Sequence, residues 1–209
     1  MSFQERYRLS EEESKEGFEL LFDGSGLDHW SGNIAGYQTE DGVIYADPEC
    51  ETSGNLFTQK EYGDFIFRFD FKLTPGANSG VGIRTPKNVD PAYGGMEIQI
   101  LDCEHPMYHD INMYQHHGAV YGILPVKPDH AEAFNPICEW NSEEIRAIGD
   151  NIRVTVNGVV IMEGNIRTAV KNGTPDGHKH EGLFNKKGFI GFLGHGSPLW
   201  LRNIRIKGL

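Results

Sequence analysis

Acidic and amide side chains on one short apolar segment are the first residues in the sequence suited to chemistry. In residues 94–105, GGMEIQILDCEH, apolar side chains alternate with Glu97 and Gln99. This period of two predicts a strand with one apolar face and one polar face. A β-bulge at Leu101 would bring Asp102 onto the polar face as well. Two carboxylates and an amide on one face suit acid–base chemistry, whereas the ordinary alternative is a face that only contacts solvent.

A glycine-rich segment carries the second candidate group. In SGVGIR (79–84), Gly80, Gly82 and Arg84 are expected to share one face of a strand. Two glycines leave room for a ligand to approach the backbone. We therefore expect Arg84 to bind a ligand oxygen or to steady Glu97, the alternative being an arginine exposed to solvent.

Histidines are concentrated between residues 103 and 117, and one stands alone near the end of the chain. His105 and His109 are four residues apart, but Pro106 argues against a helix that would aim both at one metal. The sequence leaves a divalent metal open and identifies no certain cofactor. His195 lies between two glycines, which leaves its imidazole accessible as a catalytic group; a turn histidine without a role is the alternative.

Two tryptophans have different expected roles. Trp140 follows a polar loop, and an exposed aromatic ring there suits a platform for a sugar. Trp200 alternates with leucines on both sides, so we expect it to pack in the core.

The composition excludes several classes of protein. The 209 residues include 30 acidic residues and 19 Lys plus Arg, a net charge of −11, with no basic run. Nucleic acid is therefore not an expected partner, because binding phosphate requires clustered positive charge. The three cysteines, Cys50, Cys103 and Cys138, form no CxxC pair. Neither a zinc ribbon nor a disulfide framework is indicated, and a single disulfide is left open.

The N-terminal residues predict neither export nor membrane insertion. Residues 1–21 are highly charged and contain no apolar core of a signal peptide. No apolar run approaches the ~18 residues that a spanning helix needs. We expect a cytoplasmic protein with no membrane partner, or a periplasmic or exported one if a signal has been trimmed.

Short strands with turn residues between them dominate the rest of the chain. Ser10 and Glu13 form a capping box that predicts a short helix within an N-terminal extension, residues 1–16. The pattern predicts a single all-β domain, 1–209, built as a β-sandwich or jelly roll. The expected strands are 18–22, 42–46, 55–58, 62–73, 79–84, 95–101, 118–122, 142–148, 151–156, 159–163, 188–193 and 198–207.

Long loops interrupt this pattern at 103–117, 124–141 and 168–187. Loops of this length in a compact domain are usually functional or mobile. Whether they close over a binding site is left open.

Seven short segments, in order along the chain, resemble one family of carbohydrate-active proteins. The chain is similar to the 3-keto-disaccharide hydrolase family from about residue 10 to residue 207. The matching segments are GFELLFDGSGLDHW (17–30), NSGVGIR (78–84), GMEIQILD (95–102), GAVYG (118–122), EWN (139–141), VNG (156–158) and GHGSPLWLRNIRIK (194–207). The resemblance implies a concanavalin A-like jelly roll of two antiparallel sheets with a concave groove. It also implies a small carbohydrate substrate, already oxidised at C3 by a partner glycoside 3-dehydrogenase.

The resemblance also assigns roles to particular residues. It implies catalytic roles for Glu97, Asp102, Arg84 and His195, and we expect the substrate to contact Gln99, Trp140, Asn78 and Tyr121. One departure lies at Phe192–Gly196, where the family often has Leu-Gln-x-His-Gly and this chain has no glutamine.

The implied reaction follows from the acidity of a ketone's neighbouring proton. Glu97 would remove the C2 proton, and Arg84 or a metal would stabilise the enolate. Asp102 or His195 would protonate the leaving group at C1, and water would then add. Three alternatives remain: a non-catalytic carbohydrate-binding module, a structural or interaction domain, and an ordinary glycosidase.

Overall fold

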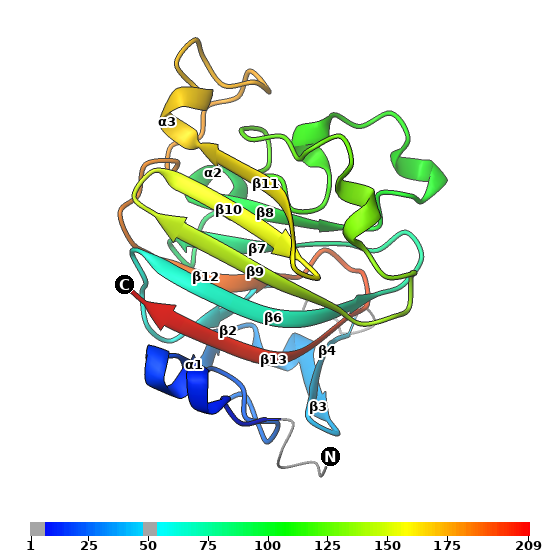
Figure 1. Cartoon of the computed structure of the whole chain (residues 1–209), viewed down its shortest axis with the longest axis vertical. Helices are drawn as coiled ribbons and strands as arrows, with labels where there is room; N and C mark the ends of the chain where they lie inside the picture. Colours follow the sequence, from blue (N-terminus) through cyan, green and yellow to red (C-terminus); the bar gives the residue numbers. More distant parts are fainter. Residues whose placement is uncertain (1–6, 48–53) are drawn as a thin grey trace.

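Two antiparallel sheets packed face to face form the computed structural model, which describes residues 7–47 and 54–209 (Figure 1). Within these ranges the larger sheet contains eight strands. Their order is β11 (Val159–Asn165), β10 (Asn151–Val156), β9 (Asn141–Ile148), β6 (Phe65–Leu73), β13 (Leu199–Gly208), β4 (Val43–Ala46) and β3 (Tyr37–Glu40), with β1 (Glu19–Leu20) beside β13.

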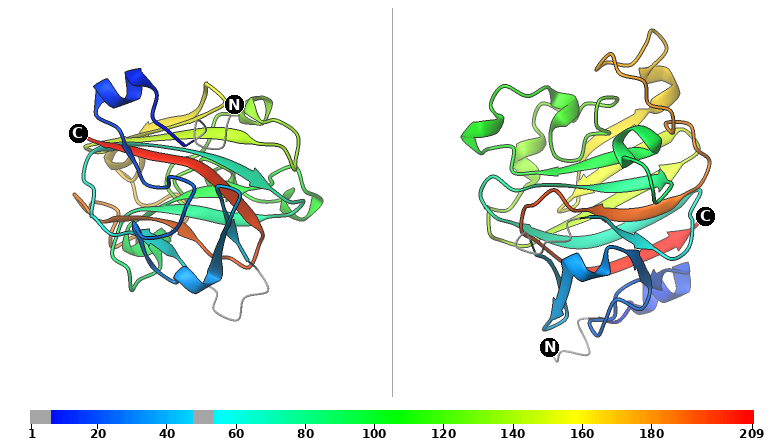
Figure 2. Two further views of the ribbon diagram at one scale, coloured as in Figure 1. Left: turned by 90° about the horizontal axis from the view of Figure 1, so that it is seen from below. Right: turned by 180° about the vertical axis from the view of Figure 1, so that it is seen from behind.

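The smaller sheet lies behind the larger one in Figure 1 and faces the viewer in the right-hand view of Figure 2. Among the described residues it has five strands, β2 (Trp30–Gly32), β5 (Leu56–Thr58), β12 (Phe189–Leu193), β7 (Asn78–Thr85) and β8 (Met96–Leu101). The prediction of a sandwich of two antiparallel sheets is confirmed.

Short helices connect or flank these strands. They are α1 (Glu11–Glu16), η2 (Ile34–Gly36), α2 (Pro91–Gly94), η3 (Pro106–Tyr108), η4 (Met113–Gln115), η5 (His130–Ala133) and α3 (Ile166–Ala169). The predicted capping box is present in α1: the Ser10 hydroxyl accepts from the Glu13 amide at 3.1 Å. Glu13 also binds Arg68 and Arg205 of the larger sheet, which fixes the helix to that sheet. No helix in the described ranges is long and apolar enough to cross a membrane.

Phenylalanines of β6 fill the space between the sheets. Phe65, Phe67, Phe69 and Phe71 are at most 1% exposed. Phe192 of β12 meets this row from the opposite sheet, with its ring centroid 5.2 Å from that of Phe69. Each buried aromatic ring contributes about 1.5–3 kcal/mol relative to exposure. Since these rings all point inward, the charged residues between them must point outward.

Most strand predictions are confirmed, and the hairpin between β10 and β11 is the clearest. Asn157 and Gly158 have φ angles of +48° and +83°, as a type I′ turn requires. The expected strand 118–122 is wrong, because Val120 forms only isolated bridges there. Residues 118–121 instead bond along the edge of β8 and turn away at Gly122, so they cover an otherwise open sheet edge. Trp200 is also not a core residue; it lies partly exposed against Tyr45 on the outer face of the larger sheet.

Arg84 occupies an irregular position at the end of β7. The pairing with β12 shifts between Gly82 and Thr85, and Arg84 has a φ of +49°. This bulge turns the guanidinium toward the larger sheet, where it donates to the Gly63 and Gly149 carbonyls and to the Asp64 carboxylate, at 2.8, 2.7 and 2.9 Å. The expectation that Arg84 shares a face with Gly80 and Gly82 is therefore wrong. Arg84 joins the two sheets at one end of the sandwich.

Replacing this buried cation tests its structural role. Arg84→Met leaves two carbonyls without donors, so we expect the free energy of unfolding to fall by about 2–4 kcal/mol. Urea denaturation measures the change. The control is Arg153→Met, which removes an arginine from an exposed pair with Glu163 and should cost less than about 1 kcal/mol. Equal losses in both variants would contradict the role given to Arg84.

Candidate functional site

The outer face of the smaller sheet carries Glu97 and Gln99. They pair with Gly82 and Gly80 of β7 in a continuous register that ends at Leu101. The predicted bulge at Leu101 is therefore absent, and the expectation that it brings Asp102 onto this face is wrong. Asp102 follows the strand, and its carboxylate accepts the Gly76 amide at 2.8 Å in the turn before β7.

The side chains of Glu97 and His195 meet on this face. The distance from Glu97 Oε1 to His195 Nε2 is 3.5 Å; the carboxylate side chain is 7% exposed and the imidazole 42%. A Cβ atom at Gly80 would lie 2.3 Å from Glu97 Oε1, so the carboxylate rests where only glycine leaves space. The bond to Glu97 raises the pKa of His195 above 6.5, against the opposing effect of burial. This pair offers a buried carboxylate beside an accessible proton donor.

Hydrogen bonds connect Gln99 and Asn78, on the same sheet, to the loop that carries His195. The Gln99 amide donates to the Asn78 side-chain oxygen at 2.8 Å, and the Asn78 backbone amide donates to the Ser197 hydroxyl at 3.1 Å. These bonds hold the His195 loop against β7. Glu97, Gln99, Asn78 and His195, all expected site residues, therefore belong to one cluster.

Tyr121 approaches the same face from the segment that covers the edge of β8. Its backbone amide donates to the Glu97 carbonyl at 2.9 Å, and its hydroxyl accepts from Gln115 at 3.5 Å. Tyr93 of α2 lies close as well: its pKa is raised by burial and further by Tyr121, Asp176 and Glu97. Tyr93 was not expected from the sequence, because its position beside Glu97 depends on how α2 packs on β7 and β8 (Figure 2).

An aspartate–histidine pair in loop 168–187 was also missed by the sequence analysis. His180 Nε2 lies 2.9 Å from the Asp176 carboxylate, and His180 Nδ1 lies 2.8 Å from the Ala92 carbonyl. The pKa of Asp176 is lowered because its bonds to His178 and His180 outweigh its burial. The four-residue spacing of the pair was a usable signal. This pair anchors the loop next to Tyr93, whose ring centroid lies 4.9 Å from that of His180.

Trp140 lies on the opposite side of the molecule from Glu97. Its ring contacts the guanidinium of Arg202 at 4.0 Å and the Lys72 ammonium at 5.3 Å, both on the outer face of the larger sheet. The expectation that Trp140 forms a platform for the substrate at this site is wrong. Cation–π contacts with strand side chains explain its position instead.

A cavity of about 530 Å³ lies apart from the Glu97–His195 pair, at one end of the sandwich. It is bounded by residues 101–106, 130–131 and 134–139, by Phe71 and Leu73 of β6, and by His117. His117 Nε2 lies 2.9 Å from the Glu143 carboxylate, and both side chains are at most 1% exposed. Glu143 was missed because its inward position in β9 follows from the strand register, where Asn141 and Glu143 interrupt the apolar alternation.

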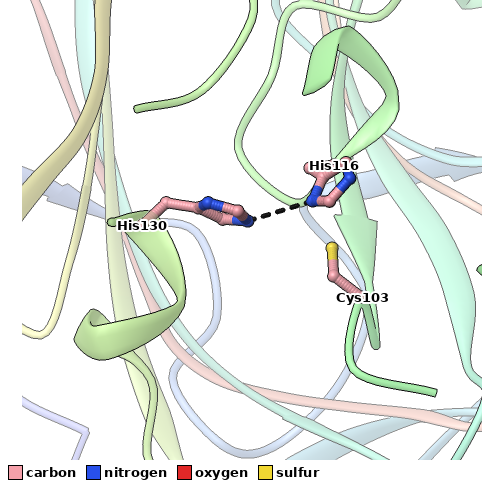
Figure 3. A group of neighbouring side chains, drawn as sticks. All are labelled: Cys103, His116 and His130. Atoms are coloured by element: carbon pink, nitrogen blue, oxygen red, sulfur yellow. Dashed lines mark hydrogen bonds between the residues drawn. The ribbon is translucent and has the colours of Figure 1, made fainter. Parts of the chain in front are cut away.

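Three potential metal ligands meet beside this cavity (Figure 3). Their ligand atoms, on Cys103, His116 and His130, all lie within 4.8 Å of one another. Burial lowers the pKa values of both imidazoles and raises that of the Cys103 thiol to about 11. His105 and His109, the histidines singled out by spacing, are not in this group. Cys103 and Cys138 are free thiols, and Cys50 lies outside the described residues.

Comparison with known families identifies the chain. Residues 17–207 match the model of the 3-keto-alpha-glucoside-1,2-lyase-like domain. The chain belongs to this family. The resemblance found in the sequence is thereby confirmed.

The chain is similar to a named hydrolase and to several proteins of known structure. A 3-keto-disaccharide hydrolase of Bacteroides thetaiotaomicron is 25% identical, over 93% of this chain and 79% of that protein. The crystal structure described as a putative glycosyl hydrolase from Parabacteroides distasonis is 30% identical, covers 92% of this chain and 99% of its own, and has a TM-score of 0.78. A galectin-like protein of unknown function from Bacillus subtilis, 12% identical with a TM-score of 0.50, shares the fold alone.

The Glu97–His195 interaction predicts a measurable shift in this lyase-like domain. Glu97→Gln removes the bond that raises the pKa of His195, so that pKa should fall toward its ordinary value of 6.5. An NMR titration of the histidine ring protons measures it. Glu181→Gln, which removes an exposed carboxylate paired with Lys179, is the control and should leave His195 unchanged. An unshifted His195 in Glu97→Gln would show that the two groups are not coupled.

Proposed function

We propose that this chain cleaves glycosides whose sugar carries a ketone at C3. Membership in the lyase-like family supports this class of substrate. The observation that carries the proposal is the Glu97–His195 pair, in which a largely buried carboxylate lies 3.5 Å from an accessible imidazole. Such a pair supplies both a base and an acid at one face.

In the proposed first step Glu97 removes the proton at C2. The neighbouring C3 ketone takes up the electron pair of the broken C–H bond, forming an enolate. Glu97 suits this role because its carboxylate lies on the outer face of the sheet beside His195 and is only 7% exposed, so little water surrounds the group that would take the proton. The glycine floor of β7 leaves the room in which the carboxylate lies.

In the second step the enolate re-forms the C3 ketone, a C1=C2 double bond forms and the C1–oxygen bond breaks. The leaving oxygen needs a proton, for which His195 is our preferred donor, since its raised pKa favours the imidazolium form. Asp102 is less suitable because its carboxylate is held by the Gly76 amide. Water then adds at C1 and a proton returns to C2, so that the net reaction is hydrolysis.

The charge that develops on the C3 oxygen needs a donor other than Arg84. The guanidinium of Arg84 is buried and donates to Gly63, Gly149 and Asp64, away from the face that carries Glu97. We propose that the Tyr121 hydroxyl takes this role, because it accepts from Gln115 and keeps its own proton for donation. A C3 ketone must come from the oxidation of a secondary alcohol, so a glycoside 3-dehydrogenase is the proposed functional partner.

Turnover of a chromogenic 3-keto-glucoside beside its unoxidised parent tests the proposal. We expect cleavage of the keto form alone. Glu97→Gln should lower kcat/KM by about 10²–10⁴-fold, since general-base catalysis is removed. Glu163→Gln, which makes the same change at an exposed residue of β11, is the matched control and should retain full activity.

Each other outcome of this assay identifies a different function. Cleavage of the unoxidised parent would indicate an ordinary glycosidase. Saturable sugar binding without turnover, measured by calorimetry, would indicate a carbohydrate-binding module. Full activity in Glu97→Gln would contradict the role of Glu97 as base. Repeating the assay with a chelator shows whether turnover depends on a metal.

The glycine floor gives a second, independent variant. A methyl group in Gly80→Ala would displace the Glu97 carboxylate, because the added Cβ would lie 2.3 Å from Oε1. We expect kcat/KM to fall at least about tenfold, as small misplacements of a catalytic group are costly, while circular dichroism shows a folded protein. Gly26→Ala is the control, since no atom lies within 4 Å of the added Cβ. Equal activity in both variants would contradict the dependence on Gly80.

A further inference from the structure

Loops 103–117 and 124–141 are brought together by a Cys/His/His cluster that plays no part in the proposed acid–base chemistry. Cys103 follows β8, His116 follows η4, and His130 begins η5. Figure 3 shows the two imidazoles facing each other and the Cys103 sulfur beside them. A thiolate and two imidazoles from separate segments are a ligand set that Zn²⁺ prefers.

The distances within the cluster suit a tetrahedral ion. His116 Nδ1 lies 3.1 Å from His130 Nε2. Two nitrogens bound to tetrahedral zinc are separated by about 3.3 Å, and nitrogen and sulfur by about 3.5 Å. The imidazoles are already at this spacing. The sulfur, within 4.8 Å of both nitrogens, needs to approach each of them by about 1.3 Å or less to match it.

Neighbouring backbone groups orient the potential ligands. The second nitrogen of His130, Nδ1, lies 2.9 Å from the Lys127 carbonyl. Donation to that carbonyl leaves Nε2 unprotonated and directed at His116. A backbone bond to Ile111 also engages the His116 ring. The backbone amide of His117 donates to the Cys103 sulfur at 3.1 Å, a contact that stabilises a thiolate. Metal sites commonly have such supporting bonds around their ligands.

We propose that Cys103, His116 and His130 bind one zinc-class divalent cation, with a fourth coordination position open to the adjoining cavity. Cys103 and His130 themselves line the cavity, so an ion held by them has access to a small ligand there. The Cys103 thiol releases its proton to solvent when the ion binds. The ordinary alternative is a hydrogen bond between the two imidazoles with no ion.

Cobalt binding to the unmutated chain is the first test and requires no variant. The protein is stripped with a chelator and titrated with Co²⁺. We expect one ion per chain, a thiolate-to-cobalt charge-transfer band and the intense visible bands of tetrahedral cobalt. Zn²⁺ should abolish both signals by displacement. The absence of a thiolate band at saturating Co²⁺ would overturn the proposal.

Variants then assign the ligands. Cys103→Ser and His130→Gln should each weaken Zn²⁺ affinity at least tenfold in a competition titration. The matched controls are Cys138→Ser, a second free thiol beside the same cavity, and His109→Gln in the same loop, both of which should bind normally. Equal loss in variants and controls would overturn the assignment. Because binding is measured directly, the result is independent of whether the chain cleaves 3-keto-glycosides.

Azide tests the open coordination position. Added to the cobalt-loaded chain, azide should shift the visible bands by entering the fourth position. An unchanged spectrum would show that a protein group already fills it and would overturn that part of the proposal.

Discussion

Close packing between the two sheets determines the direction of the strand side chains in the candidate site. The phenylalanines of β6 and Phe192 of β12 fill the interior, so each strand must turn its apolar positions inward. On β8 this requirement places Met96, Ile98 and Ile100 in the core. Glu97 and Gln99 are then directed to the outer face of the smaller sheet. The candidate acid–base site is thus a consequence of core packing.

Glycines decide what the outer face can hold. Gly80 and Gly82 lie opposite Gln99 and Glu97, and the Glu97 carboxylate occupies space that any other residue at position 80 would fill. The carboxylate can therefore lie flat on the sheet and remain largely buried while it meets His195. At the other end of β7, a bulge directs the Arg84 side chain toward the larger sheet. Strand β7 therefore contributes both the glycines beneath the Glu97 carboxylate and the arginine that connects the two sheets.

The molecule separates two centres with different chemistry. The outer face pairs an acid with an accessible histidine, an arrangement suited to moving protons. The end of the sandwich places a thiol and two imidazoles beside a largely apolar cavity, an arrangement suited to a metal. The second centre is enclosed by long loops, whereas the first is built on strands, with one loop contributing His195. Each centre can therefore be altered while the other is monitored.

The sequence by itself determined the architecture and the strand that carries Glu97 and Gln99, because both depend on local periodicity and turn residues. Two short-range signals predicted the local structure correctly: Ser10 with Glu13 for the start of α1, and Asn157 with Gly158 for the turn between β10 and β11. The resemblance to the family likewise rested on the order of short segments. Errors occurred at Arg84, Asp102 and Trp140, whose side-chain directions depend on a bulge, a strand end and a neighbouring strand. Three groupings appear only in the tertiary structure: His195 with Glu97, the Asp176–His180 pair with Tyr93, and Cys103 with His116 and His130. Each joins segments that are distant in the sequence, and no local pattern encodes that proximity.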